Sequence, residues 1–393
     1  MQLTPLPIRA TIAEYARQAD DLLEAWNADD AGAIGIVKSR HPRFLDDTIK
    51  WLPKEVSDEE ARRVPLDRDD GRLTLARWYD FAEWARLVEF VDAVTASDSR
   101  VGRFEAAVDA VVAGNLDVLE ALLEQDPDLV HARSIRVTHF DPPVHRATLL
   151  HYVAANGVER YRQMTPPNAV DVARALLRGG ADPDSLASLY GGECTTMSLL
   201  VSSCHPAQAG LQPALVDVLV DYGASVETLG EGNWTSPLMT ALVFGYRDAA
   251  DALIRRGATV RTIAAAAGLG QVDTVRALLP GSSAIDRHRA FALAAHHGHV
   301  EVVRMLLDAG EDPDRYNPPG HHTHSTALHQ AALAGHAGVV RLLVERGARL
   351  DIEDTIYHAR PIGWAHHGGQ TEIEAYLRAH ASRGGLPPAG VSN

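Results

Sequence analysis

The chain has 393 residues, of which 46 % are hydrophobic and 23 % are charged, and its formal net charge is −15. This composition predicts a folded protein with a large core and excludes an intrinsically disordered chain. Lysine occurs only at Lys38, Lys50 and Lys54, and no basic stripe interrupts the acidic residues, so we expect no nucleic-acid partner.

Targeting signals and cysteines say little about the class of protein. No apolar run approaches the roughly 20 residues that span a bilayer, and the start MQLTPLPIRA lacks the pattern of a secretory signal. We therefore expect a cytoplasmic protein without a membrane partner. Cys194 and Cys204 are the two cysteines, too few for a disulfide framework, and both are expected to be buried thiols.

The first hundred residues predict helices. Residues 11–26 place hydrophobic side chains at helical spacing after Thr11, a suitable N-cap. Residues 73–96 are rich in aromatic side chains, among them Trp78 and Phe81, which must be buried against something. We expect this segment to pack on the helices that follow; separate binding or dimerisation through the aromatic face is the alternative.

A phrase that reads as a helix, a glycine stop and a turn recurs along the chain. Its copies are ALLRGGADP (175–183), VLVDYGASV (218–226), ALIRRGATV (252–260), MLLDAGEDP (305–313) and LLVERGARL (342–350). A second phrase precedes several of them, as TLLHYVAANG (148–157), SPLMTALVFG (236–245), TALHQAALAG (326–335) and RPIGWAHHGG (360–369). Small residues such as Ala241, Ala331 and Ala365 suit helices that approach closely.

This pair of phrases resembles the ankyrin repeat, with its period of about 33 residues, its TPLHxA helix start and its GA turn. The resemblance implies an all-α ankyrin-repeat solenoid of about eight helix-turn-helix units over residues 101–382. Residues 1–100 would form an N-terminal helical cap, similar to the leader of a group of bacterial ankyrin proteins, and residues 383–393 a flexible tail. The units are expected to open near Arg103, Thr148, Thr195, Ser236, Thr262, Arg289, Thr326 and Arg360.

Three segments depart from this repeat pattern. Residues 133–147 and 161–169 read as insertions, and residues 206–213 read as a long link after an inner helix that lacks its glycine stop. We expect these departures to make the curvature of the stack irregular.

The chain contains 19 histidines, and four of them have an expected structural role. His151 and His329 hold the fourth position of TPLH, where an imidazole bonds the adjoining turn. His299 and His336 follow the glycine that ends an inner helix.

The remaining histidines of the second half are the candidates for ligand chemistry. His321, His322 and His324 lie in the finger before the seventh unit, and His358 lies in the next finger. These four are possible ligands of a metal or a small molecule, and a site built from His322, His324 and His358 is geometrically feasible. Zinc is the alternative to our expectation that the protein has no cofactor.

Catalysis has weaker support. The sequence contains no GxSxG elbow, Walker loop, GxGxxG junction or cysteine–histidine dyad, so we assign no catalytic residue. An enzyme that uses the finger histidines stays as the alternative function.

Ankyrin stacks expose a concave groove on which binding residues vary without disturbing the core. The resemblance therefore implies a protein-protein interaction module whose partner is a protein or peptide. The register places these residues in the groove: Tyr152, Asn156, Trp234, Thr240, Phe244, His296, Gln330, Trp364 and His367. His296 and His367 occupy the same slot two repeats apart, on the order of 20 Å, so they are not expected to share an ion.

Overall fold

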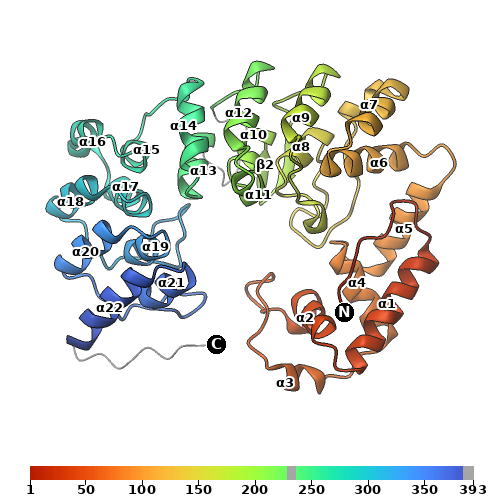
Figure 1. Cartoon of the computed structure of the whole chain (residues 1–393), viewed down its shortest axis with the longest axis horizontal. Coiled ribbons are helices and arrows are strands. Elements are labelled where there is room, and N and C mark those ends of the chain that lie inside the picture. The colour runs from red at the N-terminus through yellow and green to blue at the C-terminus, as the bar shows by residue number, and fades with distance from the viewer. Residues whose placement is uncertain (228–235, 384–393) are drawn as a thin grey trace. The chain divides into compact units, whose positions relative to one another are not determined.

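The computed structural model describes residues 1–227 and 236–383, the last two of these by their backbone only. The chain divides into two compact units, which we call the first unit (residues 1–225) and the second unit (residues 226–227 and 236–383). Each is mainly helical, as Figure 1 shows. This division falls inside the predicted solenoid, while the expected boundary between residues 100 and 101 stays a prediction.

The first unit begins with short helices that fold on one another. They are α1 (Ile12–Asn27), α2 (Ala31–Arg40), η1 (Pro42–Phe44), α3 (Asp58–Arg62), α4 (Arg68–Trp78) and α5 (Trp84–Thr95). The helix expected at residues 11–26 is confirmed, because Thr11 caps α1 through a reciprocal pair with Glu14. Tyr15, Leu22 and Trp26 form its buried face.

The aromatic segment folds as α4 and α5, with a break at Asp80, whose φ is +63°. The buried carboxylate of Asp80 accepts the backbone N–H of Arg160 at 2.6 Å and its Nε–H at 2.8 Å, and these bonds hold the break in place. Phe81 and Phe90 are buried, and the guanidinium of Arg136 lies over both rings. The expected packing of this segment on the following helices is therefore confirmed.

The rest of the first unit contains three helix pairs: α6 (Arg100–Ala113) with α7 (Leu116–Gln125), α8 (Leu149–Val153) with α9 (Ala169–Arg178), and α10 (Thr196–Leu200) with α12 (Gln212–Asp221). Between them lie η2 (Pro127–His131), η3 (Arg160–Arg162) and the antiparallel hairpin of β1 (Ala187–Leu189) and β2 (Gly192–Cys194), which pairs Ala187 with Cys194. The predicted link at 206–213 was wrong in part, since α11 (Cys204–Gln208) lies there.

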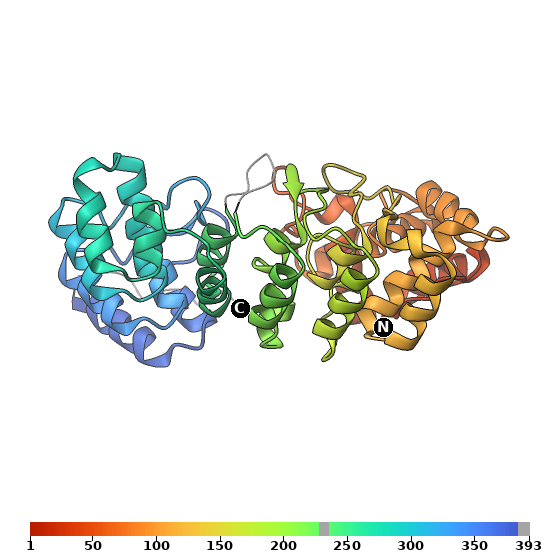
Figure 2. The same ribbon diagram turned by 90° about the horizontal axis from the view of Figure 1, so that it is seen from above.

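The second unit contains five helix pairs in two layers. The inner layer is α13 (Pro237–Val243), α15 (Ile263–Gly268), α17 (Ala284–His296), α19 (Ala327–Leu333) and α21 (Pro361–His367). The outer layer is α14 (Arg247–Arg255), α16 (Val272–Leu278) followed by η4 (Leu279–Gly281), α18 (Val300–Asp308), α20 (Ala337–Glu345) and α22 (Thr371–Arg383). From α15 onwards, neighbouring helices of each layer lie side by side, as Figures 1 and 2 show and as their contacts require.

Glycine ends the inner helices as predicted. Gly245 and Gly335 have φ of +79° and +82°, in the left-handed region that favours glycine. At Gly270 a side chain is excluded for a second reason, because a Cβ there would lie 2.6 Å from Nδ1 of His299 in the next pair. The stop glycines thus also make room for a histidine of the following repeat.

The two cysteines differ in their exposure to solvent. Cys194 is buried as expected, but Cys204 is exposed, because it opens the surface helix α11.

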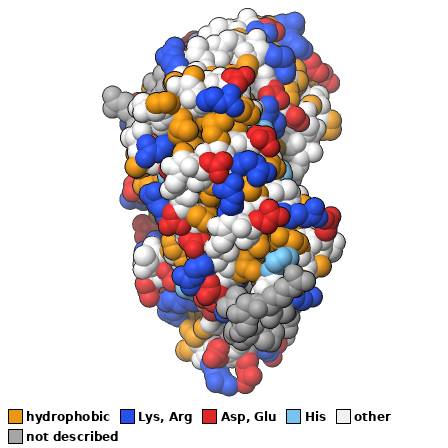
Figure 3. Space-filling model, turned by 90° about the vertical axis from the view of Figure 1, so that its left-hand side faces the viewer, with side chains coloured by type: hydrophobic (Ala, Val, Ile, Leu, Met, Phe, Trp, Pro, Cys, Tyr) orange, Lys and Arg blue, Asp and Glu red, His pale blue; other side chains and the backbone are white. Residues whose placement is uncertain are grey.

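Among the described residues, no helix combines the length and the apolar character that crossing a membrane requires. On the side formed by α16, α18, α20 and α22, Figure 3 shows Arg side chains interspersed with Asp and Glu.

Candidate functional site

Four of the nine residues predicted to line the groove are buried. Tyr152 is 1 % exposed, Thr240 2 %, Gln330 3 % and Trp364 9 %, so the prediction that they face a partner was wrong. The inner helices are so short that neighbouring elements cover nearly all their faces; all five residues of α8 are buried, for example. The side-chain amide of Gln330 already bonds within the protein, since its Nε2 donates to Ser325 Oγ at 2.9 Å.

Asn156 and Trp234 are two other residues that were predicted to line the groove. Asn156 is half-buried in the first unit, where its amide donates to Ser202 Oγ at 2.8 Å and its oxygen accepts the hydroxyl of Tyr190 at 2.7 Å. Trp234 lies outside the described residues.

The second unit carries a line of aromatic and imidazole rings, which we call the ring strip: Phe244, His322, His324 and Tyr357. Phe244 follows α13 and lies 6.4 Å from His322 between ring centroids. His322 is 6.1 Å from His324, which is 6.2 Å from Tyr357. Phe244 is 40 % exposed and Tyr357 is 54 % exposed. The strip thus joins the finger loops of successive repeats and presents large hydrophobic rings at both ends.

A buried carboxylate fixes one end of the ring strip. Asp354 is 1 % exposed and accepts the backbone N–H groups of Ile356, Tyr357 and Ala359 at 2.6–3.0 Å, and the indole N–H of Trp364 at 3.0 Å. Burial alone would raise the pKa of Asp354, but these hydrogen bonds outweigh it and hold that pKa below its ordinary value. The ring centroid of Trp364 lies 5.6 Å from that of His324, so the buried indole packs against the ring strip.

His358 and His367 are exposed. His358 does not join His322 and His324; it borders a shallow hollow of about 580 Å³ together with Asp314, Arg349 and Asp351. The site predicted from His322, His324 and His358 is therefore not assembled.

A different trio of histidines is brought together. His296 at the end of α17 and His321 and His322 in the finger loop each offer one ring nitrogen, and these three nitrogens all lie within 4.8 Å of one another. The ring centroids are 5.2–5.8 Å apart. In the part of the chain that is described, this is the one group of three or more such side chains close enough to share a metal ion.

Burial sets the protonation of this histidine trio. His321 is 1 % exposed, and burial lowers the pKa of both His296 and His321 well below the usual 6.5. Neighbouring imidazoles lower the pKa of both further. The rings are therefore neutral near pH 7, and their lone pairs are free of protons.

The four histidines with an expected structural role behave as predicted. In His151 and His329, Nδ1 accepts the backbone N–H of the helix-capping threonine at 3.2 Å, and Nε2 donates to a carbonyl of the neighbouring repeat at 3.3 and 3.2 Å. His299 and His336 each donate through Nε2 to the carbonyl oxygen of the preceding repeat at 2.9 Å.

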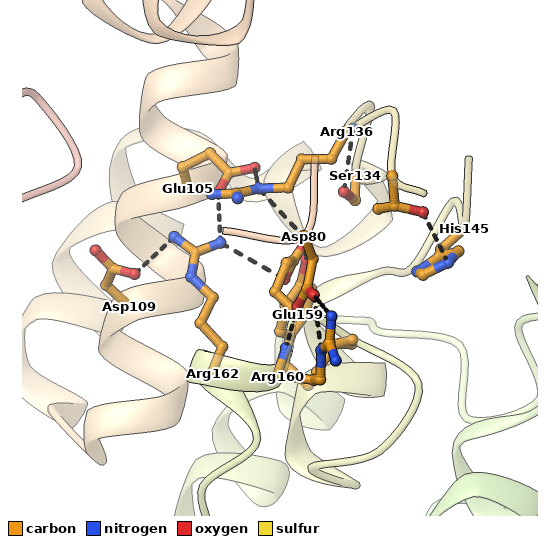
Figure 4. Close-up of polar contacts among 12 residues, drawn as sticks. Asp80, Glu105, Asp109, Ser134, Arg136, His145, Glu159, Arg160 and Arg162 are labelled. Carbon is orange, nitrogen blue, oxygen red and sulfur yellow. Dashed lines mark hydrogen bonds and ion pairs between the residues drawn. The ribbon is translucent and has the colours of Figure 1, made fainter. Parts of the chain in front are cut away.

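The first unit also contains a buried ionic network, drawn in Figure 4, that was not predicted from the sequence. Glu105 on α6 accepts from Arg136 at 2.9 Å and from Arg162 at 2.5 Å, and Arg162 also reaches Asp109 at 2.7 Å. Glu159 lies 3.4 Å from Arg136. Arg136 and Arg162 come from the two segments that we recognised only as insertions. The departure of these segments from the repeat pattern was the sign in the sequence that they have a separate structural role.

Comparison with known proteins agrees with this architecture. Residues 262–354, from the start of α15 to the loop before α21, match a family model described as ankyrin repeats in three copies. Together with the helix pairs, this shows that the chain is an ankyrin-repeat protein with an all-α fold. Ankyrin repeats are generally protein–protein interaction modules.

The other comparisons add little. No curated protein matches the chain. Among solved structures, the human ASB11 ankyrin repeat domain is similar at 22 % identity over 72 % of this chain and 99 % of that chain, with a TM-score of 0.35.

Proposed function

We propose that the second unit binds a protein segment along the ring strip. The observation that carries this proposal is the continuous line of rings from Phe244 to Tyr357, in which the two terminal rings are 40 % and 54 % exposed. Large exposed aromatic side chains provide most of the binding energy in many interfaces, because each buries much apolar surface at a small cost in side-chain entropy.

The strip is also held in a fixed shape. Asp354 bonds the backbone of the turn that carries Tyr357, and Nε2 of His322 donates to the carbonyl oxygen of Val243 at 3.0 Å. A surface that is already ordered loses little conformational entropy when a partner binds, which favours affinity.

The hollow beside Tyr357 suggests the kind of partner. Its wall includes four carboxylates, those of Asp314, Asp351, Glu353 and Asp354. Two guanidiniums offset part of this charge, since Arg349 pairs with Asp351 at 3.0 Å and Arg360 pairs with Glu353 at 3.5 Å. The remaining negative charge favours a basic residue. We therefore propose a peptide segment that carries a hydrophobic residue for the rings and a neighbouring lysine or arginine for the hollow.

The experiment is selection from a random peptide library on the intact chain, followed by calorimetric titration of the selected peptide. Phe244→Ala and Tyr357→Ala are each expected to weaken binding at least tenfold, since either removes a large exposed ring. Trp364→Ala is avoided because Trp364 is buried and supports Asp354. Trp51→Ala is the matched control, as Trp51 is an aromatic residue of the first unit with 59 % exposure.

The proposal is contradicted if the library yields no peptide that binds the wild-type chain. It is equally contradicted if the selected peptide binds both strip variants as tightly as wild type, or if Trp51→Ala weakens binding as much as they do.

A further inference from the structure

Two histidines of the second unit have buried ring nitrogens without hydrogen-bond partners. Only 1 % of His321 is exposed, yet neither of its ring nitrogens has a hydrogen-bond partner. Nδ1 of His296 is also buried without a hydrogen-bond partner. A neutral imidazole has one N–H donor and one acceptor nitrogen, and leaving such groups unpaired away from water is unfavourable. The structural histidines of the same unit, in contrast, all bond a carbonyl oxygen.

The third member, His322, bonds a carbonyl oxygen through one ring nitrogen, as many metal-ligating histidines do. Its Nε2–H donates to the carbonyl oxygen of Val243 at 3.0 Å, so the proton is on Nε2 and Nδ1 keeps its lone pair. Ligating histidines commonly donate their second ring N–H to a carbonyl or carboxylate, which fixes the tautomer and the direction of the free nitrogen.

The backbone of His322 carries strain at the same place. Its φ is +38°, which is in the left-handed region that residues other than glycine rarely adopt. Such strain persists only where surrounding contacts enforce it, and it is common where a loop holds a ligand. Here it turns the finger loop so that two consecutive histidines, His321 and His322, both lie against His296.

From this geometry we infer that His296, His321 and His322 bind one divalent transition-metal ion, with zinc as the natural occupant. Imidazole nitrogen is a ligand for zinc, copper, nickel and iron, whereas magnesium and calcium prefer oxygen. Three histidines leave the fourth position of a tetrahedral ion for water or a group of an incoming molecule. The ligand set differs from the sequence expectation, since His296 takes the place of His324 and His358.

The rings need a small adjustment to close on the ion. Zinc–nitrogen bonds of 2.0–2.1 Å place tetrahedral ligand nitrogens about 3.3 Å apart, whereas here they lie within 4.8 Å. Rotations about the side-chain bonds cover this difference without moving α17. The ion satisfies buried ring nitrogens of His296 and His321 that have no hydrogen-bond partner in the protein. This inference does not depend on the ring strip binding a peptide.

The test is cobalt(II) and zinc(II) titration of the intact chain after treatment with a chelator. Wild type is expected to bind one ion per chain, with the visible absorption of four- or five-coordinate cobalt, and zinc is expected to raise its melting temperature. Magnesium should do neither. His321→Gln and His296→Gln are each expected to lower the affinity by about 100-fold or more, because only two ligands remain.

Matched controls separate this site from adventitious binding. His358→Gln and His367→Gln remove exposed histidines of the same unit and should leave the stoichiometry and affinity unchanged. Helical circular dichroism checks that each variant is folded, and His296→Gln is the milder replacement because His296 is only partly buried. The inference is overturned if wild type shows no saturable binding. It is also overturned if folded His296→Gln binds the ion like wild type, or if binding is lost only in the exposed variants.

Discussion

At the scale of single residues, the second unit uses histidine in two ways. His329 and His336 bond backbone groups between repeats, whereas His296 and His321 lie buried with unpaired nitrogens. The structural role of His329 could be predicted from sequence, because its partners lie at fixed offsets in the repeat. The trio with His322 could not, since it depends on the path of a finger loop that periodicity does not encode.

The pKa values of the structural histidines predict how the stability of the protein depends on pH. Burial lowers the pKa of His151 and His329 to about 4 in the folded protein, against 6.5 in the unfolded chain. Between these values the unfolded chain binds more protons, so stability is lost as pH falls from about 6.5 towards 4. From pH 7.5 to pH 5 the loss should be about 2 kcal/mol per histidine.

Urea denaturation of wild type and His329→Gln at both pH values measures this effect. The variant is expected to be less stable at pH 7.5, because it loses the bonds of His329, but to lose less additional stability at pH 5. An equal loss in both proteins would show that His329 is not held neutral by burial.

Side-chain exposure was harder to predict than helical position. The register placed Tyr152, Thr240 and Gln330 correctly on inner helices, but it assigned them to the groove. Helices of five to seven residues have almost no free face once a neighbouring pair, a finger loop and the outer helix pack on them. Phe244 is exposed because it lies just beyond the end of α13, while Tyr357 was missed because it lies in an irregular turn.

At the scale of elements, helix starts and stops could be predicted and insertions could not. Thr195, Ser236 and Thr262 cap helices where the repeat pattern required. Residues 133–147 and 161–169 were recognised only as departures from the pattern. Their arginines are buried against a carboxylate far away in sequence, and no local spacing signals such a pairing.

The buried network of Figure 4 makes Glu105 important for stability. Glu105→Ala leaves Arg136 and Arg162 buried without their main counter-charge, and both are 2 % exposed in their side chains. Removing one partner of a buried ion pair costs about 3–5 kcal/mol. We expect this variant to lose the same order of stability in the first unit.

Hydrogen exchange read by mass spectrometry locates this loss. In Glu105→Ala, amides of α5, α6 and η3 should exchange faster, while those of α15 to α20 stay protected. Glu124→Ala, which removes an exposed carboxylate from α7, is the control and should change little. Normal protection around α6 in Glu105→Ala would contradict the role assigned to the network.

At the scale of the whole molecule, the repeat count was predictable because each helix pair repeats the same hydrophobic and glycine pattern. The division into two compact units was not predicted, since the helix phrases continue through residue 226 without a change of character. The candidate chemistry is unevenly distributed: the ring strip and the histidine trio belong to the second unit, whereas the buried ionic network belongs to the first.

The most direct test of the central claim is the hydrogen-exchange footprint of a library-selected peptide on the intact chain. We predict that the peptide slows exchange in residues 317–325 and 355–364, which carry His322, His324 and Tyr357, and leaves the first unit unchanged. A footprint confined to the first unit, or to the outer helices α16, α18 and α20, would contradict the proposal that the ring strip is the binding surface.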